Sequence, residues 1–310
     1  MVIDAHAHLW YEDWLPDVYW DELAERMSSI RTKQTGEKTP KDEMRQRCLS
    51  LFNDPTGERL IAEMDDAGID KTVILPLDYG LAIGEAKVSI EEVNKIYAEI
   101  SDKYPDRIIA FSGIDPRREN ALSIIEKGIK EWGMKGIKLY PPAGFYLNDK
   151  QLYPIYKTAS DLKVPVISHT GQIFGTLKSK YANPANYDDV AADFPDLVLI
   201  ASHMGLGWWS EVAWLINKRL NIKTDFSGWN PIAYSAPQTF RKTLRTMIDI
   251  AGINSIMFGT DGPAFRTTKI QNKEWVQIIK DLSNEEHETQ FSQDEIDKLL
   301  WKNAQTIYGI

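Results

Sequence analysis

Short apolar runs rich in β-branched residues recur along the whole chain and alternate with segments of helical periodicity. Most of these runs are apolar almost throughout, which is typical of a parallel strand buried on both faces. Eight runs qualify, at residues 2–5, 72–75, 108–111, 136–139, 164–168, 197–201, 222–225 and 255–259. Between them, apolar residues at helical spacing predict helices over residues 89–103, 119–132 and 149–162. The alternation predicts a (β/α)₈ TIM barrel, an α/β fold, with residues 1–310 in a single domain.

An open, doubly wound sheet is the alternative arrangement of the same elements. Such a sheet usually has a glycine-rich loop after its first strand, whereas here the first run leads into His6 and His8. Residues 205–210 begin like a dinucleotide-binding loop but lack its final glycine. The barrel is therefore the preferred prediction.

One segment interrupts the alternation. About fifty residues separate the first run from the first regular helix, far more than a usual βα loop contains. We expect residues 9–55 to form an insertion on the face of the barrel where active sites lie. This insertion is either a lid over that face or a peripheral subdomain with a charged, solvent-exposed surface.

The composition excludes several classes of protein. Asp and Glu total 45 against 36 Lys and Arg, a net charge of −9, whereas a nucleic-acid binder needs a basic face. Cys48 is the only cysteine, which excludes a disulfide framework and a thiolate metal site. No run is long enough to span a membrane, and the first residues do not resemble a signal peptide. We expect a cytoplasmic protein that acts on a small molecule, with no nucleic-acid or membrane partner. A homo-oligomer remains open.

Four of the five histidines follow strand candidates, and they are His6, His8, His169 and His203. Residues two apart on a strand point the same way, so His6 and His8 both face the barrel axis or neither does. The eighth run leads into a carboxylate, Asp261. Imidazole and carboxylate are ligands for a divalent metal such as Zn²⁺. Each residue alone has an ordinary structural explanation, but their coincidence at the ends of four strands predicts a metal site.

The fifth histidine, His287, lies in a strongly charged stretch. We expect it to be exposed and to take no part in the metal site.

The motifs at these strand ends resemble, in order and position, those of the amidohydrolase superfamily. The resemblance is greatest to its amidohydrolase-related branch, which includes aminocarboxymuconate-semialdehyde decarboxylase. It covers essentially the whole chain and rests on five segments, residues 4–8, 136–142, 168–171, 202–205 and 259–262.

The resemblance implies one divalent metal ion held by His6, His8, His169 and Asp261. Zinc is the expected metal and manganese the alternative. His203 matches a residue outside the ligand set that hydrogen-bonds the metal-bound water or the reacting group. A bound metal lowers the pKa of its water to near 7, and Asp261 or His203 could accept the proton.

Lys138, at the end of the fourth run, has three interpretations. The first is a carboxylated lysine that bridges two metals, as in binuclear members of the superfamily. The second is a cation for a substrate carboxylate or for charge that develops during the reaction, and the third is a structural lysine. We favour the cation and a single metal. The predicted catalytic residues are therefore Asp261, His203 and Lys138.

For the reaction, we favour a hydrolase that attacks a small ester, lactone or amide. The alternative is a non-oxidative decarboxylase of an aromatic or muconate-type acid, and a barrel that binds metal without turnover is the third interpretation. A decarboxylase needs a cation for the carboxylate, for which the insertion offers Arg31, Arg45 and Arg47. Aromatic residues near the expected mouth would suit a planar substrate, namely Trp10, Tyr140, Phe174, Trp208, Trp209 and Trp229.

Overall fold

The structure, a computed structural model, describes residues 1–266, 271–283 and 289–310. His287, which we expect to be exposed, lies outside the described residues. All strand pairs are parallel, in two series of neighbours, β1-β2-β3 and β4 through β9. The strands are β1 (Ile3–Ala7), β2 (Lys71–Ile74), β3 (Ile108–Ala110), β4 (Ser112–Gly113), β5 (Ile137–Leu139), β6 (Val166–Ser168), β7 (Leu199–Ala201), β8 (Ile222–Asp225) and β9 (Ile256–Met257).

The two series join into one closed barrel. Only Phe111 separates β3 from β4, and its N–H donates to the carbonyl of Ile74 at 3.1 Å, so β3 and β4 act as one broken strand. At the other junction, the N–H of Ala5 on β1 donates to the carbonyl of Phe258 after β9, at 2.9 Å. Closure gives eight strand positions around the barrel. The predicted (β/α)₈ fold is confirmed.

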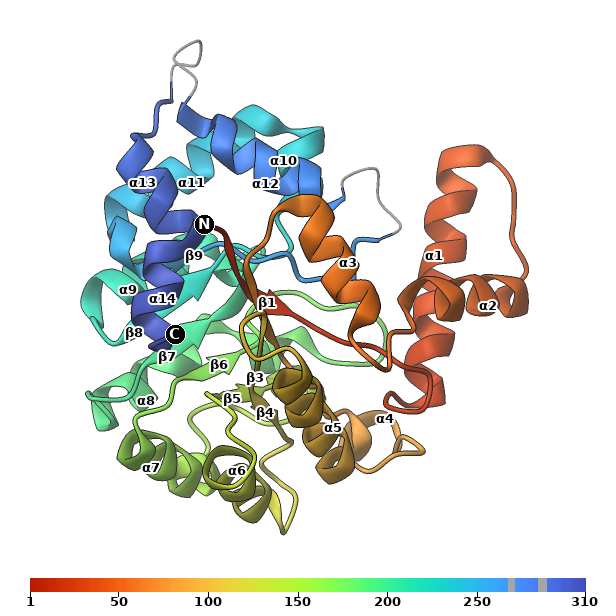
Figure 1. Cartoon of the computed structure of the whole chain (residues 1–310), viewed down its shortest axis with the longest axis horizontal. Helices are drawn as coiled ribbons and strands as arrows, with labels where there is room; N and C mark the ends of the chain where they lie inside the picture. Colours follow the sequence, from red (N-terminus) through yellow and green to blue (C-terminus); the bar gives the residue numbers. More distant parts are fainter. Residues whose placement is uncertain (267–270, 284–288) are drawn as a thin grey trace.

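Helices surround the barrel (Figure 1). The structure shortens the predicted helices to 90–103, 121–130 and 153–162, with a 3₁₀ turn at Lys150–Leu152 before the third. No described helix is long and apolar enough to cross a membrane. The helices that follow the insertion are α3 (Glu58–Ala67), α4 (Gly80–Ile83), α5 (Ile90–Lys103), α6 (Ala121–Lys130), α7 (Tyr153–Leu162), α8 (Tyr187–Asp193), α9 (Trp209–Lys218), α10 (Asn230–Ser235), α11 (Pro237–Ala251), α12 (Asn272–Lys280), α13 (Gln293–Asp297) and α14 (Asn303–Tyr308).

The insertion after β1 folds into two helices, α1 (Asp17–Thr35) and α2 (Lys41–Phe52), which extend beyond the ring of barrel helices (Figure 1). An aromatic cluster attaches them to the barrel. The Trp10 ring lies 5.6 Å from Tyr19 and 5.2 Å from Phe52, centroid to centroid. Only the first half of α1 is buried, so its second half is free to face solvent.

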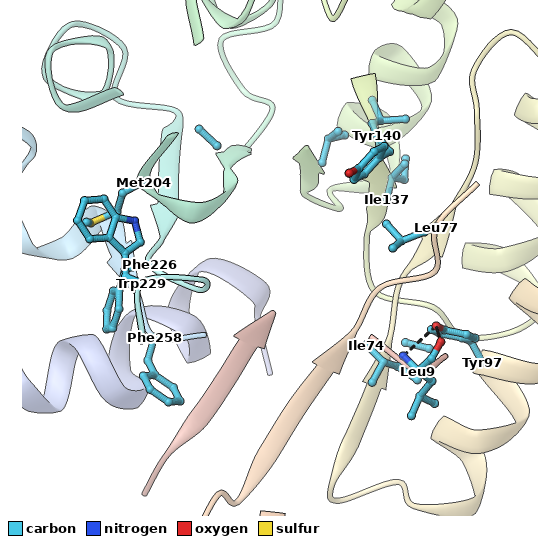
Figure 2. Close-up of a cluster of buried hydrophobic side chains, with 14 of the residues drawn as sticks. Leu9, Ile74, Leu77, Tyr97, Ile137, Tyr140, Met204, Phe226, Trp229 and Phe258 are labelled. Carbon is cyan, nitrogen blue, oxygen red and sulfur yellow. Dashed lines mark hydrogen bonds between the residues drawn. The ribbon is translucent and has the colours of Figure 1, made fainter. Parts of the chain in front are cut away.

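Two apolar layers hold the barrel together. Inside it, side chains such as Val73, Ile167 and Met257 fill the space between the strands. Tyr308 of α14 joins this inner layer, and its hydroxyl donates to the carbonyl of Ala5 at 3.1 Å. The outer layer packs strands and loops against helices, as where Tyr97 of α5 hydrogen-bonds the main chain of Leu9 (Figure 2). With its interior filled, the barrel leaves polar groups to gather at the carboxyl ends of its strands.

Candidate metal centre and active site

The carboxylate of Asp261, just after β9, lies between the two histidines of β1. Its Oδ1 is 3.8 Å from Nε2 of His6 and 3.4 Å from Nε2 of His8. The pairing of β1 with β2 shifts between Asp4 and Ala7, as in a β-bulge. A bulge re-aims side chains, which explains how His6 and His8 point into the mouth although Ala5 faces the inner core.

Asp261 adopts a left-handed backbone conformation, with φ of 55°. Its N–H donates to the carbonyl of His6 at 2.8 Å, which holds the loop after β9 against β1. Non-glycine residues with positive φ are uncommon and concentrate at functional sites. This backbone conformation places the carboxylate of Asp261 beside His6 and His8.

His169 after β6 and His203 after β7 complete the cluster. Nδ1 of His169 lies 3.1 Å from Nε2 of His203, and the ring of His203 lies 4.7 Å from that of His6. His203 also has a positive φ, of 63°. The indole N–H of Trp229 donates to its carbonyl at 2.7 Å, which stabilises this conformation.

Lys138 enters the same cluster from β5. Its Nζ lies 3.2 Å from Nε2 of His6, and its side chain is almost completely buried. The structure therefore brings together all six residues predicted from the sequence, His6, His8, Lys138, His169, His203 and Asp261.

Sequence reasoning missed two further polar residues at this mouth, Asp225 and Ser227. Asp225 is fully buried and ends β8. One carboxylate oxygen accepts from Nδ1 of His6 at 3.0 Å. The other accepts from the N–H groups of His203 and Ser227, and from the Ser227 hydroxyl. The signal was present, because Asp225 ends a predicted strand at the same level as the other site residues.

These hydrogen bonds fix the proton positions on His6 and His8. A carboxylate or a carbonyl can only accept, so a ring nitrogen bonded to one must carry the hydrogen. Nδ1 of His6 donates to Asp225, and Nδ1 of His8 donates to the carbonyl of Leu75 at 2.6 Å. In the neutral rings, Nε2 is then bare and points toward Asp261. Bare Nε2 atoms are suitable metal ligands.

The same reasoning extends to His203 and His169. The Ser227 hydroxyl donates to Asp225, so it accepts from Nδ1 of His203 at 2.7 Å. Nε2 of neutral His203 is therefore bare and accepts from Nδ1 of His169. This leaves Nε2 of His169 without a hydrogen, and it is buried with no hydrogen-bond partner among the described residues. A buried polar atom without a partner requires an explanation, and a metal ion would supply one.

Burial favours the neutral form of three histidines of the cluster, His6, His169 and His203. It lowers the pKa of His6 and of His169 well below the ordinary value, and the nearby Lys138 lowers both further. Burial also lowers the pKa of His203, against the opposing effect of Asp261 and Asp225. Metal ligation requires neutral imidazole, so the protonation of the cluster suits a cation.

The two remaining groups of the cluster carry charge. Burial alone would raise the pKa of Asp261, but the surrounding histidines, His203 first, outweigh it and lower the pKa to about 2. Burial lowers the pKa of Lys138 to about 8, and the carboxylates of Asp225 and Asp261 limit that shift. Near neutral pH the site thus combines an ionised carboxylate with a desolvated ammonium group.

Two sets of ligands share His6 and Asp261. The most compact group joins them to His203, with one donor atom from each residue within 4.8 Å of the others. Both ring nitrogens of His203 contact protein atoms, and so do both of His6, whose Nε2 lies beside the Lys138 ammonium group. Nε2 of His169, in contrast, has no partner in the described part of the chain, so His169 is the better choice of the two outer histidines. The available donor atoms therefore fit the predicted set of His6, His8, His169 and Asp261, with His203 beside it.

The arginines predicted as carboxylate binders do not reach this cluster. Arg31 pairs with Glu37, Arg45 with Asp17, and Arg47 with Glu43, all on the outer surface of α1 and α2. Their charge was visible in the sequence but their direction was not. Of the predicted aromatic residues, Tyr140 does reach the site, and its ring lies 4.7 Å from that of His169.

A family model for amidohydrolases matches residues 3–310. The chain belongs to the amidohydrolase family. The predicted resemblance to the amidohydrolase superfamily is thereby confirmed. No curated protein matches this amidohydrolase significantly.

Solved structures with the same fold cover nearly the whole amidohydrolase. One is 5-carboxyvanillate decarboxylase from Sphingomonas paucimobilis, with 17% identity, a TM-score of 0.69, and coverage of 100% of this chain and 99% of that one. A second is dihydroxybenzoic acid decarboxylase from Polaromonas sp. JS666, with bound manganese and the inhibitor 2-nitroresorcinol. It has 19% identity, a TM-score of 0.65, and coverage of 99% and 96%.

A third is 4-oxalomesaconate hydratase from Rhodopseudomonas palustris, with 19% identity, a TM-score of 0.63, and coverage of 100% and 96%. At these identities the likeness shows the fold of the amidohydrolase, because one barrel fold hosts many chemistries.

Proposed function

We propose that this amidohydrolase is a metal-dependent, non-oxidative decarboxylase of an aromatic carboxylic acid. The observation that carries the proposal is the Lys138 ammonium group, which is buried beside the histidine–aspartate cluster. The ring of Tyr140 contacts His169 of the same cluster. A desolvated cation at this position suits a substrate carboxylate. The similar decarboxylase structures support this reaction over the hydrolysis that the sequence favoured.

The residues present fit a divalent metal ion. His6, His8 and His169 each offer a bare Nε2, Asp261 is ionised, and Nε2 of His169 has no partner in the described part of the chain. When bound, the metal would supply a Lewis acid that holds and polarises an anionic oxygen of the substrate. The bound manganese of the similar decarboxylase makes Mn²⁺ a candidate beside the Zn²⁺ expected from the ligand types.

Decarboxylation exchanges a carboxylate for a hydrogen. A proton adds to the ring carbon, the bond from that carbon to the carboxylate breaks, its electron pair returns to the ring, and CO₂ leaves. Lys138 would hold the carboxylate before the bond breaks. Desolvation of the site favours loss of the charged group as neutral CO₂.

Asp261 and His203 are the candidates for carrying the proton. Nε2 of His203 faces His169 and is occupied by that contact. The Asp261 side chain is 19% exposed, more open than either histidine of β1. We therefore assign proton transfer to Asp261, whose ionised carboxylate first takes a proton from solvent and then passes it to the ring carbon. His203 holds His169 in the correct tautomer.

The test uses protein loaded with Mn²⁺ or Zn²⁺ and incubated with hydroxybenzoic acids in D₂O. We expect CO₂ release, with deuterium on the product carbon that carried the carboxylate. Lys138→Met should lower kcat/KM about 10- to 100-fold, because it removes a charged hydrogen bond. Lys157→Met is the matched control, because Lys157 is 71% exposed, and it should leave kcat/KM unchanged. Turnover of lactones or esters without CO₂ release would contradict the proposal and restore the hydrolase.

A further inference from the structure

A buried carboxylate outside the proposed ligand set connects two parts of the metal centre. Asp4 lies on β1 and is 1% exposed. Its Oδ1 accepts from the N–H of His6 at 3.1 Å and from the N–H of Thr260 at 2.9 Å, and its Oδ2 accepts from the Thr260 hydroxyl at 2.6 Å. Among the described residues its hydrogen-bond partners are these three donors, none of which is a cation. A buried carboxylate without a cation is costly to keep, so its position requires an explanation.

Thr260 extends this contact to the far side of Asp261. Its Oγ1 donates to Asp4 and also accepts from the N–H of Gly262 at 3.0 Å. The carbonyl of Gly262 accepts in turn from the N–H of His8 at 2.6 Å. The residues on both sides of Asp261 are therefore attached to β1 or to the residue that follows it, and Thr260 takes part on both sides.

Asp261 needs such support because of its backbone conformation. With φ of 55° it lies in the left-handed region, which a non-glycine residue keeps only where its surroundings hold it there. In this conformation its Oδ1 lies 3.8 Å from Nε2 of His6 and 3.4 Å from Nε2 of His8. Rotation of φ to the ordinary negative range would re-aim the side chain, because φ sets the direction of the Cα–Cβ bond relative to the preceding chain. The direction of the carboxylate thus depends on the hydrogen bonds of the neighbouring residues.

We propose that Asp4 and Thr260 are positioning residues that hold Asp261 in its left-handed conformation and so set the affinity of the centre for its metal. The inference rests on the proposed ligation of a divalent metal by His6 and Asp261. The carboxylate of Asp4 contacts the main chain of both ligand segments, at His6 and at Thr260. It therefore fixes the separation of the two ligands, and a preformed set of ligands binds more tightly than one that must first be ordered.

A structural clasp is the competing explanation for the same hydrogen bonds. They join β1 to the loop after β9, across the junction that closes the barrel. A clasp alone would contribute to the free energy of unfolding but not to the metal affinity of the folded protein. A positioning role has a different signature, namely a loss of metal affinity that depends on the presence of Asp261. The two explanations therefore differ in a measurable quantity.

The first measurement is the Kd for Zn²⁺ of folded Thr260→Val protein, by titration against a competing chelator. Valine keeps the shape of threonine but lacks the hydroxyl, so Asp4 loses a donor and the N–H of Gly262 loses an acceptor. We expect the Kd to rise about 10-fold, the lower end of the range for partners of metal ligands. Thr260→Ser keeps the hydroxyl and should keep the wild-type Kd. Thr246→Val, which removes an exposed hydroxyl on α11, is the matched control.

The second measurement repeats Thr260→Val in an Asp261→Ala background. Three histidine ligands remain there, so Zn²⁺ binding is still measurable. Because the proposed effect acts through Asp261, Thr260→Val should not change the Kd further in this background. Asp4→Asn replaces Thr260→Val if that variant does not fold. Its amide nitrogen cannot accept from the Thr260 hydroxyl, so the Kd should rise in this variant as well.

The outcomes separate this inference from the proposed function. An unchanged Kd in Thr260→Val, with or without a lower free energy of unfolding, overturns the positioning role. A loss of the same size in both backgrounds overturns it too, because the effect would not act through Asp261. Failure of the wild type to bind Zn²⁺ overturns both the inference and the metal-dependent function. Weaker binding that depends on Asp261, in a protein that releases no CO₂, supports the positioning role and refutes the decarboxylase.

Discussion

Replacing Asp225 by Asn should weaken metal binding although Asp225 is not a proposed ligand. The variant keeps the shape of the side chain, and one oxygen still accepts from the N–H groups of His203 and Ser227, at 3.1 and 3.0 Å. The amide nitrogen then faces Nδ1 of His6, which in the native protein donates to the carboxylate at 3.0 Å. An amide N–H cannot accept, so His6 must move its hydrogen to Nε2, the atom assigned to the metal.

The expected loss of metal affinity can be taken from other metal sites in which a carboxylate hydrogen-bonds a histidine ligand. Loss of a carboxylate that orients a histidine ligand costs about 10- to 100-fold in metal affinity, or about 1.4–2.8 kcal/mol. Because Asp225 is fully buried, solvent cannot replace the lost acceptor. We therefore expect the Kd for Mn²⁺ or Zn²⁺ to rise within this range.

The assay is a metal titration against a competing chelator, with circular dichroism to check folding. Asp249→Asn is the matched control, because Asp249 is 61% exposed on α11 and should leave affinity unchanged. A folded Asp225→Asn protein with the wild-type metal affinity would refute the tautomer assignment. It would also refute the choice of Nε2 as the ligating atom of His6.

Three further predictions concern other parts of the structure. His169→Ala should abolish tight metal binding, whereas His203→Asn should retain most of it, as measured by elemental analysis of the purified variants. The reverse result would favour the ligand set of His6, His203 and Asp261. Arg266→Ala should lower the free energy of unfolding by about 1–3 kcal/mol in a denaturant titration, because Arg266 pairs with Glu63 and donates to the last carbonyls of α2. In the metal-free protein, the Lys138 pKa of about 8 lies below its ordinary 10.5, so the unfolded chain binds more protons between these values. Stability from this group should therefore rise from pH 8 toward 10.5, and Lys138→Met should remove that rise in pH-dependent unfolding curves.

The sequence allowed the barrel and its six central residues to be predicted because both depend on local patterns. A strand buried on both faces is apolar throughout, so a histidine or aspartate at its end is conspicuous. His169 and Asp261 are found by this rule. The same rule applied to the strand ending at Asp225 would have found that residue too, but an aspartate at a strand end is also a common turn former.

The ring contacts that link Tyr19, Tyr79 and Tyr140 to His169 were beyond sequence reasoning. Tyr140 was a candidate only because it follows a strand, and Tyr19 and Tyr79 had no local signal. Their contact depends on how α1 returns to the barrel, which is a tertiary property. The arginines of the insertion show the converse error, because Arg45 has the right charge but pairs with Asp17 and Asp21 on the surface. Residue type gives the chemistry, and packing decides which residues meet.

Because the first and last strands close the barrel, the histidine–aspartate cluster can form only after nearly the whole chain has been synthesised. Thr260 and Asp4 hydrogen-bond across a separation of 256 residues. At ribosomal rates of about 5–20 residues per second, roughly 10 to 50 s pass between the synthesis of the two sides of the centre. Throughout that interval the growing chain carries His6 and His8 without their carboxylate. Loading of the proposed metal would therefore be a late event that must await the final strand, whatever the supply of metal around the ribosome.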